Sequence, residues 1–422
     1  MEIVISTILA AGFAALSPSQ LIQQVPRDHP DRVGVELPTP PWCGDCLRLG
    51  VSAAIAGDFA LLGDDGRRDG PPKAGMLVAY QRHKGRWQPT QAIQAPVPTI
   101  GDAFAAAIAL DGDRLLVGSP GDPVGGPGGG RAWIYRLKGE RWEPEGMLAP
   151  AEPHPGLGYG WSVALSGDLA AVGSPSWDHD GNWDLGRVEI FRRTAGSWHR
   201  ETVLEAPSQA TSTRFGWALA FSSDGRQLLI GAPGFDLPVD RTGAVFAATH
   251  SGNGYWSISR QLQASEPGVL DRFGGAIGCT SSHAVIGMEG SDRGGRNAGA
   301  VAIAQTSPNF RLVAEHVEPA RDGARLGSRI AARHGLVAVL AGGAQSPRGG
   351  RGLVRVMRYS KGDFHAVLDL QAHAGLPPIG AAIAVDNMQL LLTAIVDEDG
   401  VPEPGRAWVI QAPGISPGLS DR

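Results

Sequence analysis

The sequence lacks an excess of positive charge and lacks any apolar run long enough to cross a membrane. Its 37 Lys and Arg residues stand against 42 Asp and Glu residues, which gives a net charge of −5. No basic patch stands out, so the composition argues against a general polyanion binder and a nucleic-acid partner. The apolar run of residues 3–16 is shorter than the roughly 20 residues of a membrane-spanning helix, and no other stretch qualifies.

The motifs of several enzyme classes are also missing. There is no G-x-S-x-G nucleophile elbow and no H-E-x-x-H zinc motif, and the 11 histidines are scattered along the chain. The glycine-rich residues 125–130 lack the Lys-Ser/Thr pair and the helix of a phosphate loop. We therefore assign no catalytic residue. Carboxylates that meet across repeats to cleave or eliminate a glycoside stay an alternative, because sequence alone does not show such a meeting.

Glycine and proline are abundant, with 60 and 32 residues, and the glycines recur at fixed positions of an internal repeat. Each copy begins with an aromatic or large aliphatic residue followed by a small one. The seven copies begin at Leu49, Phe104, Tyr159, Phe215, Phe273, Leu326 and Ile379. The period of 53 to 58 residues is typical of a propeller, a solenoid or an array.

Each repeat carries signals for four strands. Two short apolar runs flank a turn such as Gly112-Asp113 or Gly167-Asp168, which predicts a hairpin. A glycine then opens a third strand in all seven copies, at Gly75, Gly130, Gly186, Gly243, Gly299, Gly352 and Gly405. An aromatic residue, interpreted as packing between sheets, marks a fourth strand at Trp87, Trp142, Trp198, Trp256, Phe310 and Phe364. The pattern predicts an all-β, seven-bladed β-propeller of four-stranded blades.

The seventh copy has no residues for a fourth strand, because its aromatic would fall in the tail of residues 412–422. An alternating segment, Val33–Leu37, precedes the first copy. We therefore expect an N-terminal strand to complete the last blade and close the ring, which removes exposed strand edges. The predicted organisation is an N-terminal segment at 18–48, seven repeats at 49–411 and the tail.

The repeats resemble the FG-GAP family, which forms the propellers of integrin α-chains and of many bacterial secreted proteins. Phe215-Gly216, Phe273-Gly274 and Tyr159-Gly160 match the first half of the motif. Gly231-Ala232-Pro233, Gly118-Ser119-Pro120 and Gly173-Ser174-Pro175 match the second half. The resemblance covers roughly residues 33–411 and is closest to the bacterial branch. It implies a propeller with a recognition role, but the integrin calcium loop is not carried over because the connection is too short here.

The N-terminus and the cysteines indicate an exported protein. Residues 1–17 contain an apolar core and a small-residue cleavage region after Ala14 or Ser17, typical of a signal peptide, although the basic leader is missing. Cys43 and Cys46 form a Cys-Gly-Asp-Cys pair, interpreted as a disulfide in an oxidising compartment. A redox-active pair and a metal site with two further ligands are the alternatives. We expect a secreted, periplasmic or cell-surface location.

One loop carries the sharpest candidate site. Its residues Asp178, Asp180, Asn182 and Asp184 place oxygen ligands at alternate positions, as a calcium ion requires, although the glycine comes earlier than in an EF-hand. The alternative is a solvated loop in which Asp and Asn favour the turn. Trp177 and Trp183 flank these acids outside the repeat register, and exposed aromatics of this kind bind sugars or protein side chains.

The sequence therefore favours an exported, non-catalytic and monomeric recognition, adhesion or scaffold module for a protein or glycan, with calcium as the candidate cofactor. One alternative is a propeller enzyme, a polysaccharide lyase or hydrolase, with its site at the mouth of the central channel. A second alternative is a purely structural cell-surface protein.

Overall fold

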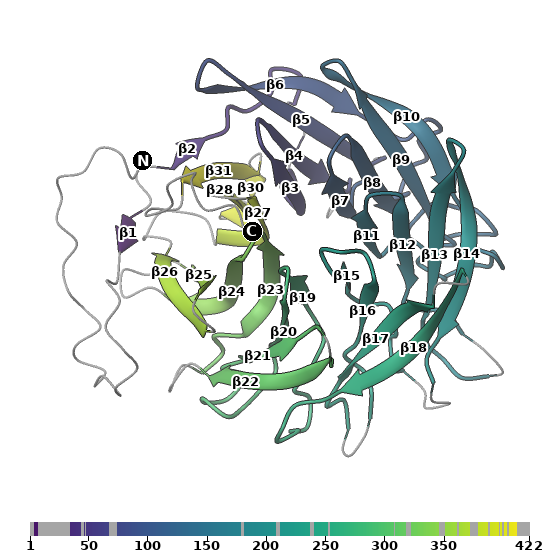
Figure 1. Cartoon of the computed structure of the whole chain (residues 1–422). Helices are drawn as coiled ribbons and strands as arrows, with labels where there is room; N and C mark the ends of the chain where they lie inside the picture. Colours follow the sequence, from purple (N-terminus) through teal and green to yellow (C-terminus); the bar gives the residue numbers. More distant parts are fainter. Residues whose placement is uncertain are drawn as a thin grey trace.

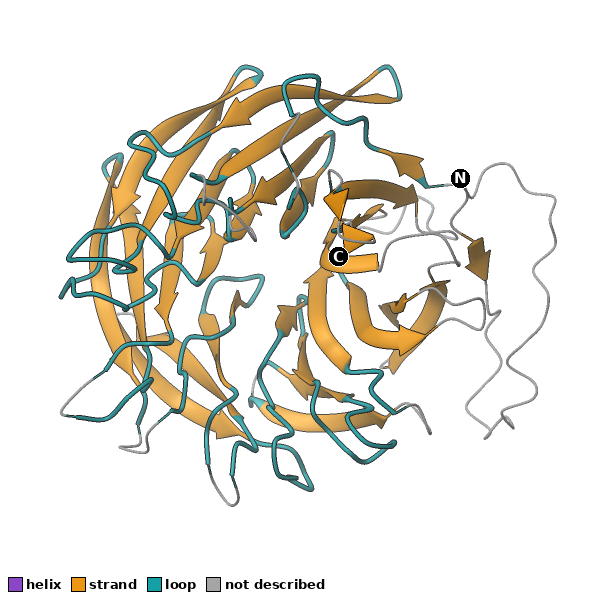
Figure 2. Ribbon diagram, turned by 180° about the vertical axis from the view of Figure 1, so that it is seen from behind, coloured by secondary structure: helices purple, strands orange, loops and turns teal. Residues whose placement is uncertain are grey.

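The computed structural model arranges the chain as seven four-stranded antiparallel blades around a central axis, and the residues it describes form no helix (Figures 1 and 2). The structure describes residues 4–6, 34–43, 46, 48–66, 74–178, 181–207, 212–236, 240–251, 254–307, 309–317, 322–345, 351–360, 363–371, 379–386, 389–395, 397–398, 401–402 and 405–411. In these ranges no helix is long and apolar enough to span a membrane. The predicted fold class is confirmed.

In each blade the first strand lies nearest the axis and the fourth lies outermost. Blade 1 comprises β3 (Ser52–Ala56), β4 (Phe59–Asp64), β5 (Met76–His83) and β6 (Arg86–Ile93). Blade 2 comprises β7 (Ala107–Asp111), β8 (Arg114–Ser119), β9 (Arg131–Lys138) and β10 (Arg141–Leu148). Blade 3 comprises β11 (Ser162–Ser166), β12 (Leu169–Ser174), β13 (Arg187–Thr194) and β14 (Ser197–Glu205). Blade 4 comprises β15 (Leu219–Phe221), β16 (Gln227–Ala232), β17 (Ala244–Ser251) and β18 (Tyr255–Leu262).

The remaining blades follow the same plan, with additions at their edges. Blade 5 comprises β19 (Ile277–Cys279), β20 (His283–Met288), β21 (Ala300–Gln305) and β22 (Arg311–Val317). Blade 6 comprises β23 (Leu326–Arg333), β24 (Leu336–Gln345), β25 (Arg351–Ser360) and β26 (Asp363–Gln371), with β1 (Val4–Ser6) beside β26. Blade 7 comprises β27 (Ile379–Asp386), β28 (Gln389–Ala394), β31 (Arg406–Gln411) and β2 (Val35–Glu36). A small hairpin of β29 (Asp397–Glu398) and β30 (Val401–Pro402) lies between β28 and β31.

The N-terminal strand closes the ring, as predicted. In β2, Val35 pairs with Val409 and Glu36 pairs with Trp408 of β31. The ladder continues where the Leu37 amide donates to the Ala407 carbonyl at 2.8 Å. Both carboxylate oxygens of Glu36 accept hydrogen bonds from Arg406, at 2.6 and 2.7 Å. Blade 7 thus obtains its outer strand from the other end of the sequence.

The first repeat is anchored next to this strand. Cys43 and Cys46 are joined by a disulfide with their Cα atoms 5.2 Å apart, which is the predicted pairing. Both cysteines are buried in a core cluster together with Leu37 and Leu49. The rest of the predicted signal peptide, residues 1–3 and 7–17, and the tail of residues 412–422 lie outside the described residues. Cleavage of a signal peptide therefore stays a prediction.

The repeat motif joins neighbouring blades. The glycine before a third strand forms a parallel bridge with the first residue of the next repeat, as in Gly130–Tyr159 and Gly186–Phe215. The same glycine of the seventh repeat, Gly405, lies against Leu49 of the first, so the contact runs around the whole ring. The fourth-strand aromatics are buried as predicted, except for Trp198, which is half-buried.

The second residue of the repeat motif needs a left-handed backbone. Gly160 and Gly216 have φ angles of +91° and +88° at this position, but the second repeat carries Ala105 with φ +67°. An alanine there is strained by roughly 1–2 kcal/mol. We predict that Ala105→Gly raises the free energy of unfolding by about 0.5–1 kcal/mol in a denaturant titration, since part of the gain is lost to backbone entropy. Gly160→Ala is the matched reverse change and should destabilise; a destabilising Ala105→Gly would refute the argument.

One side chain connects blades that are not neighbours. Arg333, at the end of β23 in blade 6, donates to the Leu110 carbonyl and to Asp111 of blade 2, both at 3.0 Å. Its Nε also lies 3.5 Å from Asp386 of blade 7. Arg333, Asp111 and Asp386 each follow the repeat start by seven residues, so one repeat position places opposite charges around the axis.

Candidate functional site

The loops on one face of the propeller are built to a common plan. In blades 3 and 4 the loop between the second and third strands docks on the loop that enters the next blade. Ser212 donates its amide to the Trp183 carbonyl at 2.7 Å, and Leu270 donates to Asp240 at 3.0 Å. A second backbone hydrogen bond follows in each loop pair. The Arg214 amide donates to the Asp184 carbonyl at 2.9 Å, and the Arg272 amide donates to the Arg241 carbonyl at 3.2 Å. Residues 183–184 and 240–241 therefore occupy equivalent places in blades 3 and 4.

The acids of the predicted calcium loop have a structural role where they are described. Asp178 accepts the amide of Asp184 at 2.7 Å and so closes the loop. Equivalent loops of other blades use the same bond, in which Asp236 accepts from Arg241 at 3.0 Å and Asp292 accepts from Asn297 at 2.7 Å. The recurrence shows that an Asp here closes the loop, as short polar side chains commonly do.

Asp180, one of the four predicted calcium ligands, lies outside the described residues. Asp178, Asn182 and Asp184 are described. In the described part of the chain, no group of three or more His, Cys, Asp and Glu side chains is placed to hold a metal ion. The calcium site therefore stays a prediction.

The two tryptophans of this loop have different environments. Trp177 is 3 % exposed and packs in a core cluster with Tyr159 and Leu185, and the Arg187 guanidinium lies 4.7 Å from its ring centre. The interpretation of Trp177 as an exposed aromatic is wrong, because its indole is buried beneath Arg187. Trp183 is 71 % exposed and is tied to the entry loop of blade 4 by the Ser212 hydrogen bond. A binding role for Trp183 stays a prediction.

A pocket lies beside that loop, between blades 4 and 5. Its volume is about 120 Å³, and its lining is rich in arginine with one aromatic ring and one carboxylate. The lining residues are Ser212, Arg214, Trp217, Pro233, Gly234, Arg241, Arg272, Gly275 and Glu289. They come from the entry loops of blades 4 and 5, the ends of their second strands and the blade 4 loop that carries Arg241. The pocket therefore opens on the face formed by these loops.

The arginines of the pocket fall into two classes. Arg272 donates to one oxygen of Glu289 at 3.1 Å, and Arg325 of the next blade donates to the other oxygen at 3.1 Å. Arg214 and Arg241 have only distant carboxylates, Asp184 at 3.8 Å and Asp240 at 4.0 Å. Among the described residues neither of these two guanidinium groups donates a hydrogen bond. Two guanidinium groups with free donors therefore line the pocket, beside one that Glu289 holds in place.

Two tryptophans form a partly exposed pair next to the arginines. Trp161 and Trp217 each follow the repeat start by two residues, in blades 3 and 4. Their ring centres lie 4.8 Å apart with a 45° tilt, and Trp161 is 37 % exposed. The Arg214 guanidinium lies 5.3 Å from the centre of the Trp217 ring, a cation–π distance. The pocket thus combines exposed aromatic surface with free cationic donors.

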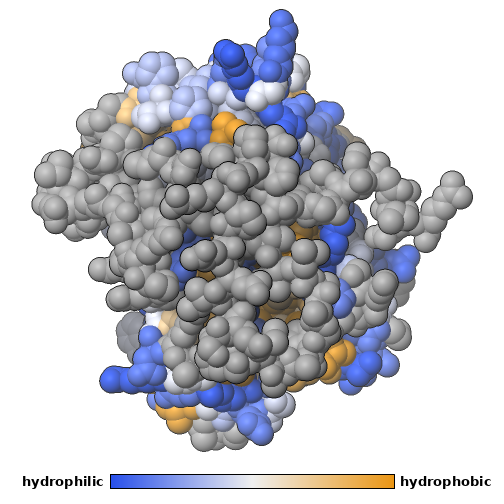
Figure 3. All heavy atoms as spheres, turned by 90° about the vertical axis from the view of Figure 1, so that its left-hand side faces the viewer, coloured by the Kyte–Doolittle hydropathy of each residue, from blue (hydrophilic) through white to orange (hydrophobic). Residues whose placement is uncertain are grey.

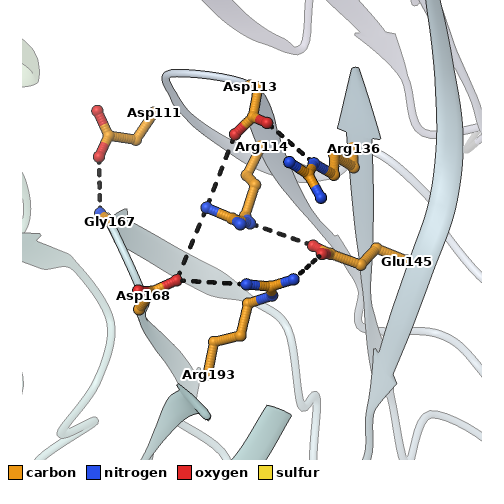
Figure 4. Close-up of polar contacts among 8 residues, drawn as sticks. All are labelled: Asp111, Asp113, Arg114, Arg136, Glu145, Gly167, Asp168 and Arg193. Carbon is orange, nitrogen blue, oxygen red and sulfur yellow. Dashed lines mark hydrogen bonds and ion pairs between the residues drawn. The ribbon is translucent and has the colours of Figure 1, made fainter. Parts of the chain in front are cut away.

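The opposite face, where the hairpin turns lie, carries a balanced ionic network (Figure 4). Arg114 contacts Glu145 at 3.2 Å and Asp168 of blade 3 at 3.7 Å, and Arg193 of blade 3 contacts Glu145 at 3.0 Å. Burial acts against ionisation of Asp113, but the hydrogen bond from Arg136 and the charge of Arg114 lower the pKa of Asp113 below its ordinary value. Each of these arginines has a close carboxylate, so the network joins blades 2 and 3.

Comparison with known proteins supports the fold and no more. No family model matches the chain, and no curated protein matches it in sequence. The chain is similar to a solved propeller enzyme. That structure is the periplasmic gluconolactonase PpgL of Pseudomonas aeruginosa, with 16 % identity and a TM-score of 0.50 over 76 % of this chain and 85 % of that one. At this identity the likeness shows the fold alone.

Sequence reasoning missed the residues that form the pocket, although a signal was present. Arg214, Arg272 and Arg325 each immediately precede a repeat start, and Arg48 does so in the first repeat. Trp161 and Trp217 share the third position of the repeat. These recurrences place arginines and tryptophans on the face of the entry loops, but only the structure shows which of them lack close partners.

Proposed function

We propose that the chain is an exported recognition module of the FG-GAP type, and that it binds a glycan or protein ligand at the pocket between blades 4 and 5. The observation that carries the proposal is the pairing of partly exposed Trp161 and Trp217 with two arginines that have free donors. Tryptophan and arginine are the residues most enriched at the energetic centres of interfaces. The recurrence of both motif halves in register supports the FG-GAP assignment.

Three observations support the exported location. The Cys43–Cys46 disulfide is a feature of oxidising compartments. The apolar residues 3–16 suit a signal peptide. The structural neighbour is described as periplasmic.

Binding is better supported than catalysis at this pocket. Glu289 is the carboxylate of the lining, and both of its oxygens accept hydrogen bonds from arginines. Histidine does not occur in the lining. The neighbour's gluconolactonase activity keeps an enzyme as the alternative, to be tested with lactone and polysaccharide substrates.

The proposal predicts that binding depends on Trp217. The purified mature chain, tested on an array of glycans and secreted proteins with and without calcium, is expected to bind a ligand that Trp217→Ala weakens at least about tenfold, the effect of losing an interface centre. Tyr255→Ala is the control, because Tyr255 is 69 % exposed at the start of β18 in blade 4. Equal loss in both variants, or no ligand at all, would contradict the proposal.

A further inference from the structure

We infer that the ligand of the pocket is an acidic sugar, a glycan unit that carries a carboxylate on its ring. This inference rests on the proposed recognition function and specifies its ligand class. Three features of the pocket lead to it: the free guanidinium donors, the aromatic surface beside them and the size of the space between them.

The free donors select an anion with two oxygens. Arg214 and Arg241 come from different loops and both line the pocket, and their nearest carboxylates are at 3.8 and 4.0 Å. A guanidinium presents five N–H donors in a planar fork that matches a carboxylate. Since Asp184 and Asp240 are too far away to use those donors, a ligand carboxylate can take them without displacing an existing hydrogen bond.

Glu289 restricts where in the pocket an anion can bind. It accepts hydrogen bonds from Arg272 and Arg325, so the guanidinium edges that face Glu289 are already used. A bound anion is therefore directed toward Arg214 and Arg241, and a ligand with a hydroxyl group can donate it to the Glu289 end, since carboxylates accept hydrogen bonds.

The aromatic surface favours a ring over an extended chain. A pyranose presents a face of C–H groups, and this apolar face can pack flat against an indole, where burial of apolar area is favourable. Trp217 lies in the lining, with Trp161 next to it at 4.8 Å. A phosphate ion or an acidic side chain would use the arginines but would leave the indole surface uncovered.

The size of the pocket suits one ring. Its volume of about 120 Å³ corresponds to roughly ten water positions, which is below the several hundred Å³ of a typical cofactor pocket. One acidic sugar ring is of this order, with neighbouring units of the glycan lying over Trp161. The chain as a whole has a net charge of −5, so the selection is local to the pocket.

Calorimetric titration of the mature chain with trisaccharides of galacturonate, glucuronate and mannuronate tests the inference. At least one of them should bind, and its methyl ester and the matching neutral trisaccharide should bind at least tenfold more weakly. The double variant Arg214→Gln/Arg241→Gln should lose at least tenfold in affinity for the acid and should bind the neutral sugar unchanged. Arg226→Gln is the control, because Arg226 is 85 % exposed on the hairpin-turn face of blade 4, and thermal melts verify folding.

The outcomes separate this inference from the proposed function. Equal binding of neutral and acidic trisaccharides, lost in Trp217→Ala, would overturn the acidic-sugar inference and leave glycan recognition standing. Equal binding of a triglutamate peptide or of inorganic phosphate would show that the arginines alone select the ligand and would overturn it as well. Binding of proteins on the array with no response to any uronate would overturn it but keep recognition. No binding partner of any kind would overturn both.

Discussion

Deletion of residues 31–38 is expected to lower the melting temperature by about 5 °C and to promote aggregation. The deleted segment contains β2, which forms the outer strand of blade 7 by pairing with β31. Leu37 is buried, and its burial contributes about 2 kcal/mol. The ladder hydrogen bonds contribute about 1 kcal/mol each, so the total loss is on the order of 5 kcal/mol.

The deletion also exposes the edge of β31, whose free N–H and C=O groups can pair with another chain. Differential scanning calorimetry measures the loss of stability, and size-exclusion chromatography measures the aggregation. Val35→Thr is the control, because Val35 is 51 % exposed and threonine keeps the strand. If the deletion and the control melt at the same temperature, β2 does not hold the ring closed.

The second large effect is expected for Gly405→Ala, with a loss of about 3 kcal/mol or more in the free energy of unfolding. A Cβ at Gly405 would lie 1.8 Å from the carbonyl oxygen of Leu49 and 2.7 Å from its carbonyl carbon. These are backbone atoms, so they can move away only if the last and first blades separate. The clash therefore falls on the junction that closes the ring.

Gly146→Ala is the matched control for this substitution. Gly146 lies in β10, and a Cβ there would meet only the Trp198 side chain at 3.4 Å, an ordinary contact. In guanidinium titrations the Gly146 variant should stay within about 0.5 kcal/mol of the parent. A Gly405 variant that unfolds at the same denaturant concentration as the Gly146 variant would show that the closing junction is loosely packed.

The sequence predicted the fold well because the fold is periodic. The Gly-Asp turns, the third-strand glycines and the fourth-strand aromatics recur from repeat to repeat. The pattern therefore stays recognisable where a single copy departs from it. For the same reason, the sequence showed that the last copy lacks a fourth strand. The alternating residues near Val35 were predicted to supply that strand. The residues that recur are the ones that pack in the core and at the blade junctions, so the periodicity predicted both.

The candidate site was less predictable because it depends on how residues of successive repeats meet. Asp178 and Trp177 were predicted as site residues because they lie close together in one acidic loop of the sequence. In the structure Asp178 closes that loop, and Trp177 is buried beneath Arg187. Arg214 and Arg241 are 27 residues apart in the chain, and the fold of blade 4 places both of them in the lining of one pocket. These two arginines lack close carboxylates because of where their side chains lie, and the spacing of residues along the sequence does not predict that.

The contact of Arg333 with blades 2 and 7 has a consequence for how the protein loses its structure. In an array whose repeats touch only their neighbours, unfolding can begin at one end and spread repeat by repeat. Arg333 in blade 6 is hydrogen-bonded to Asp111 in blade 2. Blades 6 and 2 lie on either side of the blade 7 and blade 1 pair, so this contact bridges the junction at which the ring closes. A brief detachment of the two-residue β2 would leave blades 6 and 2 tied together. The ends of the chain can then fray and re-pair while blades 6 and 2 stay connected, and we expect unfolding to be more cooperative than in an open array of repeats.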